Sequence, residues 1–511
     1  MLLHSKEFND QKYWISYTKG GSVRKWYGNN DFVIFWKNGG NYLTRNRNTN
    51  SKYYLKPCFT WSLIGSNRFS TRFCDVGFLW DVSGSIGVPY NEQWKQVLGF
   101  MNSKLVSSFL YILNPTINTN IEDIDALPFI PSEATVIDDI VVNNISISKL
   151  DWDSHETSWD FKTNELYRLA LGITYEQAES SLTTRINLNL SLESLVSQYI
   201  AYWDDKFKQL HHNEIELNRK FIEIYGLQDE LTPDVPLDEI TILQKGEISI
   251  EDNRIVWYKD VIIKQLISWM VGCFMGRYSA DKPGLIMASQ GQKVADLDLQ
   301  AMTLEIDDDG IIPIIPEADF FTDDMTQRIE AGVKALFGEL QFYDNMRYIK
   351  ACLGQELRDY LYRDYYDDHM QMYSVKGAKR PIYWLFSSKM GDKKKKGYFK
   401  ALVYMHRIES DTLSKLHADY VSPYIDKVEQ QLKEAEDDAV RDDLSQAQRN
   451  KANKLAAELA DKVREVKEFA TILAQMSTQR LTIDLDDGVK TNYPKYYPLV
   501  EPIKGLESKD E

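Results

Sequence analysis

The sequence predicts an α+β protein in which a β-rich N-terminal domain is followed by a largely helical body. Three observations support this class. Short β-branched and aromatic runs alternate with Gly and Asn clusters over residues 12–90. A helical apolar period runs through residues 192–225, and residues 408–478 are rich in Ala, Glu, Lys and Gln. At 511 residues the chain exceeds what one core normally serves, so we expect two to four domains.

The first domain is expected over residues 1–131 and consists mainly of strands and turns. Its candidate strands are the runs VIFW, YYLK, FTWSLI and GFLW. One helix is expected near 91–112, because one face of it would carry Trp94, Val97, Leu98, Met101, Leu105, Val106 and Phe109. The segment LPFIP ends the domain.

The body is expected to contain four further parts. A connector over 132–240 includes a long amphipathic spacer helix, and a mixed α/β domain follows over 241–407. Within that domain, PIYWLF and YFKALVYM are predicted as a strand pair joined by a Lys-rich connection. Residues 408–480 suit an antiparallel helical hairpin better than a single rod, and 481–511 form a tail.

Charge divides the chain unevenly. Residues 1–110 hold fourteen Lys and Arg against six Asp and Glu, whereas the whole chain carries −16, so the remainder carries −24. Six of the twelve tryptophans also lie in this basic stretch. A basic, aromatic surface joined to an acidic body is typical of a protein that reads nucleic acid.

Basic and aromatic side chains between residues 19 and 72 are the candidate DNA contacts. Lys and Arg neutralise phosphates, aromatic rings stack on bases, and Arg reads guanine in the major groove. The candidates are Lys19, Arg24, Lys25, Trp26, Tyr27, Arg45, Arg47, Lys52, Arg68 and Arg72. Charge reversal at Arg24 and Lys25 is expected to weaken DNA binding. The alternative is a β-rich module whose tryptophans form the core and whose lysines form a solvated face.

The sequence contains no recognised motif for catalysis, cofactor binding or metal binding. Methylation of a base amine requires a (D/N/S)-P-P-(Y/F/W) tetrapeptide, and none of the fifteen prolines precedes another proline. No glycine loop has the G-x-G-x-x-G spacing, and the calcium-loop-like EIDDDG and IDLDDG are interpreted as acidic turns. Four scattered cysteines and an N-terminus without an apolar h-region indicate a reduced, cytoplasmic protein without a membrane segment.

Several blocks of the sequence resemble a known family. KGGSVRKWYGNN, LGFMNSKLVSSFLYILNPTINTN, GCFMGRYSADKPGLI and FKALVYMHRI are similar to the C-terminal half of PglX, the adenine-specific DNA methyltransferase of bacteriophage-exclusion (BREX) defence systems, and to related type IIG restriction-modification enzymes. The resemblance implies that residues 1–131 form a target recognition domain. It also implies that S-adenosylmethionine binding belongs to an upstream domain, so the chain is expected to be a split gene product, a truncation or a deliberately shortened form.

The resemblance also implies partners: double-stranded DNA, other BREX proteins and a separate methyltransferase chain. Two alternatives remain open at this point. One is a protein-binding scaffold subunit of the defence complex. The other is the C-terminal half of a split methyltransferase that is active only with a separate catalytic chain.

Overall fold

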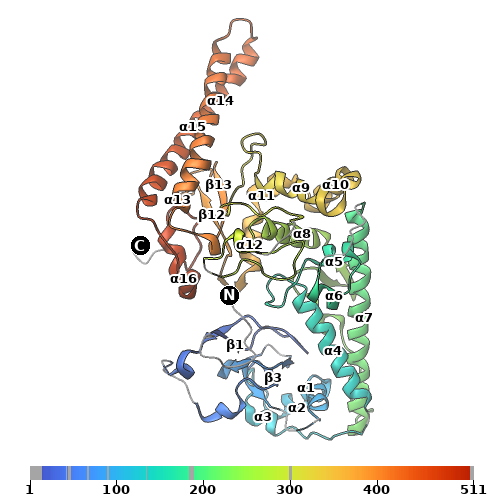
Figure 1. Ribbon diagram of the computed structural model, residues 1–511. Coiled ribbons are helices and arrows are strands. Elements are labelled where there is room, and N and C mark those ends of the chain that lie inside the picture. Colours follow the sequence, from blue (N-terminus) through green and yellow to red (C-terminus); the bar gives the residue numbers. More distant parts are fainter. Residues whose placement is uncertain are drawn as a thin grey trace. The chain divides into compact units, whose positions relative to one another are not determined.

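The computed structural model describes residues 14–41, 43, 48–65, 68–88, 91, 93–133, 135–182, 189–289, 291–297 and 302–506. The chain forms two compact units. Unit 1 comprises Met1–Glu165 and Val196–Ile262, and unit 2 comprises Leu166–Leu195 and Ile263–Glu511 (Figure 1). Small sheets and many helices confirm the α+β class. The finer division at residues 131, 240, 407 and 480 stays a prediction.

Unit 1 begins with two small sheets. The first has the order β2-β1-β5 and pairs β1 in parallel with β5: β1 (Trp14–Thr18), β2 (Val33–Phe35) and β5 (Phe78–Trp80). The second is antiparallel with the order β4-β3-β6: β3 (Cys58–Trp61), β4 (Thr71–Cys74) and β6 (Ile86–Gly87). The strand predicted at YYLK is wrong, because Leu55 has a φ of +60°, a left-handed backbone that no strand adopts.

The single helix predicted over 91–112 is also wrong, since two helices occupy this segment. They are α1 (Trp94–Met101) and α2 (Lys104–Leu113). The backbone turns out of the helix at Ser103, while the Asn102 amide pairs with both backbone groups of Thr71 at 2.9 and 3.0 Å. Asn102 therefore ends helix α1, because its side-chain amide bonds to the backbone of strand β4.

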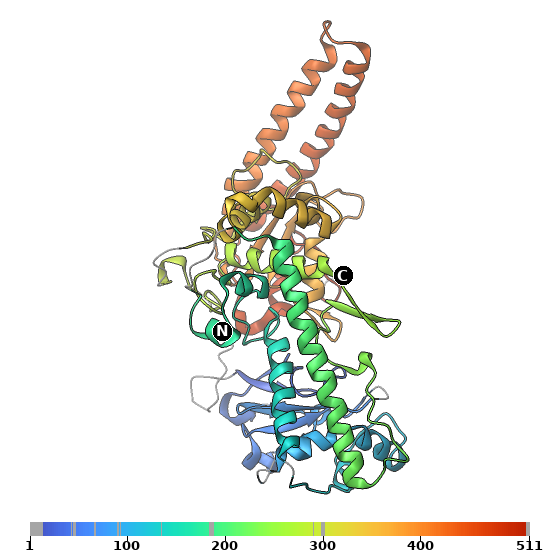
Figure 2. The same ribbon diagram turned by 90° about the vertical axis from the view of Figure 1, so that its right-hand side faces the viewer.

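Two long helices complete unit 1. The spacer helix is confirmed as α7 (Leu192–Tyr225), and it lies beside α4 (Val136–Asp153) in both views (Figures 1 and 2). The Asn213 amide joins them by donating to the side-chain oxygens of Asn143 and Asn144, each at 2.8 Å. The remaining elements are α3 (Ile121–Asp125) and the hairpin β7 (Ile248–Glu251) with β8 (Arg254–Trp257).

Unit 2 is built on an antiparallel sheet with the order β12-β13-β9. Its strands are β9 (Ile311–Pro313), β12 (Tyr383–Ser387) and β13 (Lys400–Tyr404), so the predicted strand pair is confirmed. Its shorter elements are α5 (Glu165–Leu171), α6 (Tyr175–Ser180), α8 (Lys259–Phe274), α9 (Met325–Phe337), α10 (Phe342–Leu353), α11 (Leu357–Arg363), α12 (Tyr365–Met372), β10 (Ser374–Val375) and β11 (Ala378–Lys379).

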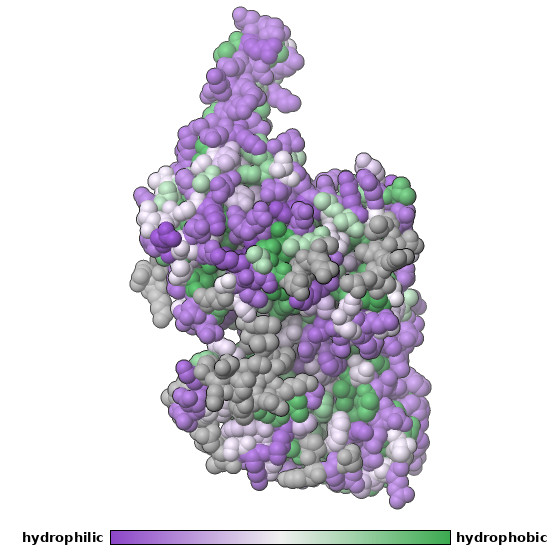
Figure 3. Space-filling model, viewed as in Figure 1, coloured by the Kyte–Doolittle hydropathy of each residue, from purple (hydrophilic) through white to green (hydrophobic). Residues whose placement is uncertain are grey.

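The predicted helical hairpin is confirmed in unit 2 as α14 (Ser422–Val440) and α15 (Gln446–Ser477), preceded by α13 (Thr412–Lys415) and followed by α16 (Gly488–Asn492). Its visible surface is largely hydrophilic in Figure 3. Glu465 of α15 ties the hairpin to the connection between β12 and β13, because its carboxylate accepts the backbone N–H groups of residues 396–398 at 2.8–3.0 Å. Among the described helices, none combines the length and the apolarity needed to cross a bilayer.

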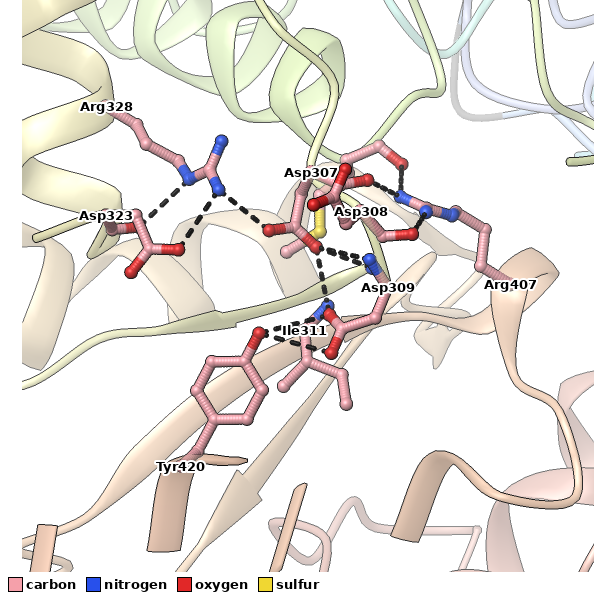
Figure 4. Close-up of polar contacts among 10 residues, drawn as sticks. Asp307, Asp308, Asp309, Ile311, Asp323, Arg328, Arg407 and Tyr420 are labelled. Carbon is pink, nitrogen blue, oxygen red and sulfur yellow. Dashed lines mark hydrogen bonds and ion pairs between the residues drawn. The ribbon is translucent and has the colours of Figure 1, made fainter. Parts of the chain in front are cut away.

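The segment EIDDDG forms an acidic turn in unit 2, as interpreted from the sequence (Figure 4). The Asp307 carboxylate accepts the N–H groups of Asp309, Gly310 and Ile311 and pairs with Arg328 at 2.8 Å. The pKa of Asp309 is raised to about 7, mainly because the carboxyl is buried and secondly because the charge of Asp307 lies close to it. These contacts fix the chain where it enters β9.

Candidate nucleic-acid interface

Of the eight candidate DNA contacts that the structure describes, five are buried in unit 1: Arg24, Lys25, Trp26, Tyr27 and Arg72. Three of them form a buried clamp with two carboxylates, Asp151 of α4 and Glu214 of α7. Arg24 pairs with Asp151 at 2.7 Å, and Lys25 pairs with Glu214 at 2.6 Å. The indole N–H of Trp26 donates to the other oxygen of Glu214 at 2.8 Å. In this structure the buried clamp holds the β-rich part against α4 and α7.

The clamp is extended by a backbone group and a side chain from a distant loop. Asp151 accepts the N–H of Leu243 at 2.8 Å with its other oxygen, and the hydroxyl of Thr241 accepts the N–H of Lys25 at 2.9 Å. Both clamp carboxylates therefore have hydrogen bonds beyond their ion pairs, which is the condition under which buried charges are tolerated.

Arg72 and Tyr27 lie beside the clamp. Arg72 is 1% exposed, and burial lowers its pKa to about 10. Its guanidinium donates to the carbonyl of Arg24 at 3.4 Å. Burial raises the pKa of the Tyr27 hydroxyl, and the negative charge of Asp153 raises it further. Contact of these five side chains with DNA stays a prediction.

The other candidates have different surroundings. Arg68 is exposed and pairs with Asp238 at 2.9 Å, while Lys52 is exposed with its ammonium 4.8 Å from the centre of the Tyr53 ring. Lys19 is half-buried. Arg45 and Arg47 lie outside the described residues.

A pocket of about 460 Å³ opens in the same part of unit 1. We call it the α2 pocket, because the C-terminal end of α2 forms one wall; the other walls come from residues 21–23, from residues 62, 65 and 68–70, and from the segment 114–123. Two backbone hydrogen bonds join the last two segments, from Gly65 N–H to Ile117 O at 2.9 Å and from Thr119 N–H to Leu63 O at 2.8 Å. Its polar lining residues are Ser22, Ser62, Arg68, Ser70, Ser107, Asn114, Thr116, Asn118, Thr119 and Asp123.

Exposed apolar side chains lie on the segments that form this pocket or next to its lining residues in sequence. Tyr111 is 76% exposed at the end of α2, where it lines the pocket. We call the exposed set around it the apolar rim: Ile64, Tyr111, Ile112, Leu113, Ile117 and Ile121. Exposed apolar groups gathered in one place usually mark a binding surface. The sequence does contain a signal, because three consecutive large apolar residues at a helix end cannot share one buried face.

Among the described members of the predicted set, Arg68 alone lines the α2 pocket. Sequence reasoning missed Tyr111, Asn114 and Ser107, since none of them belongs to a charged or glycine-rich run. Among the described residues, no group of three or more His, Cys, Asp or Glu side chains is arranged to hold a metal ion.

No protein-family model matches the chain. The chain is 32% identical over 520 residues to the adenine-specific methyltransferase BrxX of Escherichia coli O9:H4 (strain HS), which covers 96% of this chain and 40% of that protein. It is also 32% identical over 519 residues to the adenine-specific methyltransferase PglX of Lacticaseibacillus casei (strain Zhang), which covers 97% of this chain and 40% of that protein.

The chain thus spans about two fifths of the length of these curated relatives, and the match extends over nearly all of the chain. The resemblance inferred from the sequence blocks is confirmed. The chain is similar, over nearly its whole length, to a portion of these two adenine-specific methyltransferases.

Proposed function

We propose that unit 1 recognises the DNA target site of a PglX-like adenine-specific methyltransferase in BREX phage defence. The observation that carries this proposal is the α2 pocket. Hydroxyl and amide groups line it, Arg68 lies in its wall, and exposed Tyr111 stands at its edge. These are the groups that hydrogen-bond to base edges and stack on bases.

Exposed basic side chains in the N-terminal part of unit 1 support the same proposal. Four basic residues are exposed in the described part of residues 14–110: Lys37, Lys52, Lys56 and Arg68. Such side chains supply the phosphate contacts that hold a protein in register on the duplex. Arg68 can exchange Asp238 for a phosphate, because both partners of this ion pair are exposed and such pairs contribute little stability.

The buried candidates receive an indirect role in this proposal. Arg24, Lys25 and Trp26 support the loop from which Gly21 and Ser22 enter the pocket wall. Methyl transfer and S-adenosylmethionine binding would belong to the part of the relatives that this chain does not match. The proposed partners are double-stranded DNA, other BREX proteins and a catalytic methyltransferase chain, all in the cytoplasm.

Substitution of Tyr111 tests the proposal. Tyr111→Ala removes an exposed ring and hydroxyl at the edge of the pocket, so we expect DNA affinity to fall about tenfold, since a contact to a base edge in the groove contributes about 1–3 kcal/mol. Unfolding should be unchanged, because the side chain is 76% exposed. Fluorescence anisotropy with a labelled duplex measures the affinity. The matched control is Tyr343→Ala in unit 2, where the tyrosine is 82% exposed. Equal affinity of both variants and the wild type would contradict a DNA-reading pocket.

The apolar rim supports a second candidate function, docking of protein. Ile64, Ile112 and Ile117 are large, exposed and apolar, which suits a protein interface better than a phosphate backbone. The fitting occupant is the catalytic part of a PglX-like methyltransferase. In that case Ile112→Ser would abolish co-purification with a separately expressed catalytic chain and leave the anisotropy of the DNA complex unchanged.

A further inference from the structure

Unit 2 contains a pocket of its own, with a volume of about 580 Å³. Its walls come from α9, α10 and the start of α11, three helices that pack against one another (Figure 1). We call it the α9 pocket. Its volume lies within the range of roughly 300–1,000 Å³ that is usual for small-molecule sites. The proposed DNA-reading role of unit 1 does not use this pocket.

One wall of the α9 pocket is apolar. Phe342 and Met346 are four residues apart on α10, so their side chains lie on the same face of that helix. Leu357, the first residue of α11, adds a third apolar side chain and is 4% exposed. Such a wall suits the hydrocarbon part of a ligand.

Two polar side chains of α9 line the pocket without a hydrogen-bond partner. Thr326 and Glu330 are also four residues apart and share one face of their helix. Thr326 is 6% exposed, and Glu330 is half-buried. In the part of the chain that the structure describes, neither side chain makes a hydrogen bond or an ion pair. Burial raises the pKa of Glu330 above its usual value, although the charge of Arg358 opposes this rise. Both side chains can therefore accept hydrogen bonds from a ligand.

The positive charges of the pocket wall already have partners. Three ion pairs account for them: Arg358 with Asp324 at 2.6 Å, Arg347 with Asp344 at 2.6 Å, and Lys350 with Glu356. Lys334 follows Glu330 by one helical turn, but its ammonium lies 4.4 Å from the centre of the Phe342 ring. Among the charged residues that line the pocket, Glu330 is thus the one without an ion pair.

We propose that the α9 pocket binds a primary ammonium group carried on an apolar stem. An ammonium has three N–H donors and no acceptor, so Glu330 can neutralise it while the Thr326 hydroxyl accepts a second hydrogen bond. Phe342, Met346 and Leu357 would cover the stem. An anionic ligand fits less well, because it would meet an unpaired carboxylate and cations that are already paired. Small amines and the lysine side chains of other proteins both carry this chemistry.

Titration of the full chain with hexylammonium chloride, at constant ionic strength, tests the site. Met346 lines the pocket, so NMR of protein labelled with ¹³C in the methionine methyl groups reports on binding, and Met346→Leu identifies the signal. We expect a saturable shift, with affinity lower by about tenfold or more in Glu330→Gln, which removes a charge-assisted hydrogen bond. The matched control is Glu339→Gln, at an exposed glutamate outside the pocket, which should bind like the wild type. Absence of a saturable shift in the wild type, or equal affinity of a Glu330→Gln variant that circular dichroism shows to be folded, would overturn the proposal.

A second measurement uses only the wild type and so does not depend on the folding of a variant. Hexanol and hexanoate carry the same stem with a neutral and a negative group, and both should bind more weakly than hexylammonium. Equal or tighter binding of either would overturn the proposal.

A short peptide, acetyl-Gly-Lys-Gly-amide, then distinguishes the two sources of the ligand. If it shifts the Met346 signal at concentrations similar to those of hexylammonium, and more weakly in Glu330→Gln, the pocket accepts a lysine side chain of a protein. If hexylammonium shifts the signal and the peptide does not, the ligand is a small amine.

Discussion

Arg24 and Lys25 are neighbours in the chain, but their ion-pair partners are far away in sequence. Asp151 lies 127 residues from Arg24, and Glu214 lies 189 residues from Lys25. The sequence predicts a basic segment between glycines, and this prediction rests on residue type alone. Whether a charge faces solvent or a buried carboxylate depends on tertiary partners that no local pattern reveals.

The buried clamp makes a prediction about stability. Arg24→Met leaves the Asp151 carboxylate buried without its charge partner, so we expect the free energy of unfolding of unit 1 to fall by about 3–5 kcal/mol. Urea unfolding measures the change. Lys52→Met, at an exposed lysine, is the control and should change the free energy of unfolding by less than about 0.5 kcal/mol.

The double variant Arg24→Met/Asp151→Leu removes both buried charges. It should recover most of the lost stability, because replacing a whole buried pair by apolar groups is often neutral. If Arg24→Met unfolds at the urea concentration of the wild type, the buried clamp does not contribute to stability. Reversal of charge at Arg24 and Lys25, which the sequence suggests as a test of DNA binding, thus acts first on folding.

At the scale of elements, long regular patterns were predictable and local breaks were not. The apolar period of α7 continues over 34 residues, and the β12–β13 pair is marked by two dense aromatic and β-branched runs. The break between α1 and α2 arises from hydrogen bonds between Asn102 and strand β4, a contact made after the chain has folded back. The α2 pocket was equally hidden, because its walls come from three separated segments.

The proximity of two cysteines is another contact that the sequence pattern does not predict. Cys58 and Cys74 are distant in sequence, without the spacing of a known motif, and the sequence gives no reason to pair them. They face each other across β3 and β4 in the buried core, and none of the four cysteines forms a disulfide. Strand register alone brings these two thiols together.

The link between the hairpin and the sheet of unit 2 makes a prediction at this scale. The Glu465 carboxylate accepts three consecutive N–H groups, of residues 396–398, and the hydroxyl of Ser388 at 2.6 Å. In Glu465→Ala these groups lose their buried acceptor, so we expect their amide hydrogen exchange to accelerate at least tenfold, about 1.4 kcal/mol or more. Hydrogen-exchange mass spectrometry measures this rate.

A neighbouring glutamate provides the control for that experiment. Glu458 lies on the same helix and is exposed, so Glu458→Ala should leave the exchange of residues 396–398 unchanged. Equal acceleration in both variants would indicate a general loosening of α15. Unchanged exchange in Glu465→Ala would show that the carboxylate does not hold the β12–β13 connection to the hairpin.

At the scale of the whole molecule, the stability of the protein depends on pH, and a buried histidine of unit 1 is one source of this dependence. In unit 1, burial alone would lower the pKa of His155, but the buried Glu247 carboxylate beside it raises the pKa above its usual 6.5. A raised folded-state pKa means that this contribution to stability is complete below pH 6.5. It is lost as the pH rises through the folded-state value.

Comparison with His155→Gln measures this contribution. The difference in free energy of unfolding between wild type and variant should be largest near pH 5.5 and should shrink steadily towards pH 9. Urea unfolding at several pH values, followed by a fluorescence probe in unit 1, provides the data. A difference that grows with pH would show that the folded-state pKa of His155 is depressed instead.

Residues 1–110 carry +8 and residues 111–511 carry −24, the division of charge that we expect if the first part approaches DNA and the rest avoids it. The most direct test of this account is selection of bound sequences from randomised duplexes by the full chain, repeated over a range of salt concentrations. We predict one enriched motif, with affinity that falls steeply as salt increases. Absence of binding at low salt would contradict the account and favour a protein-docking subunit.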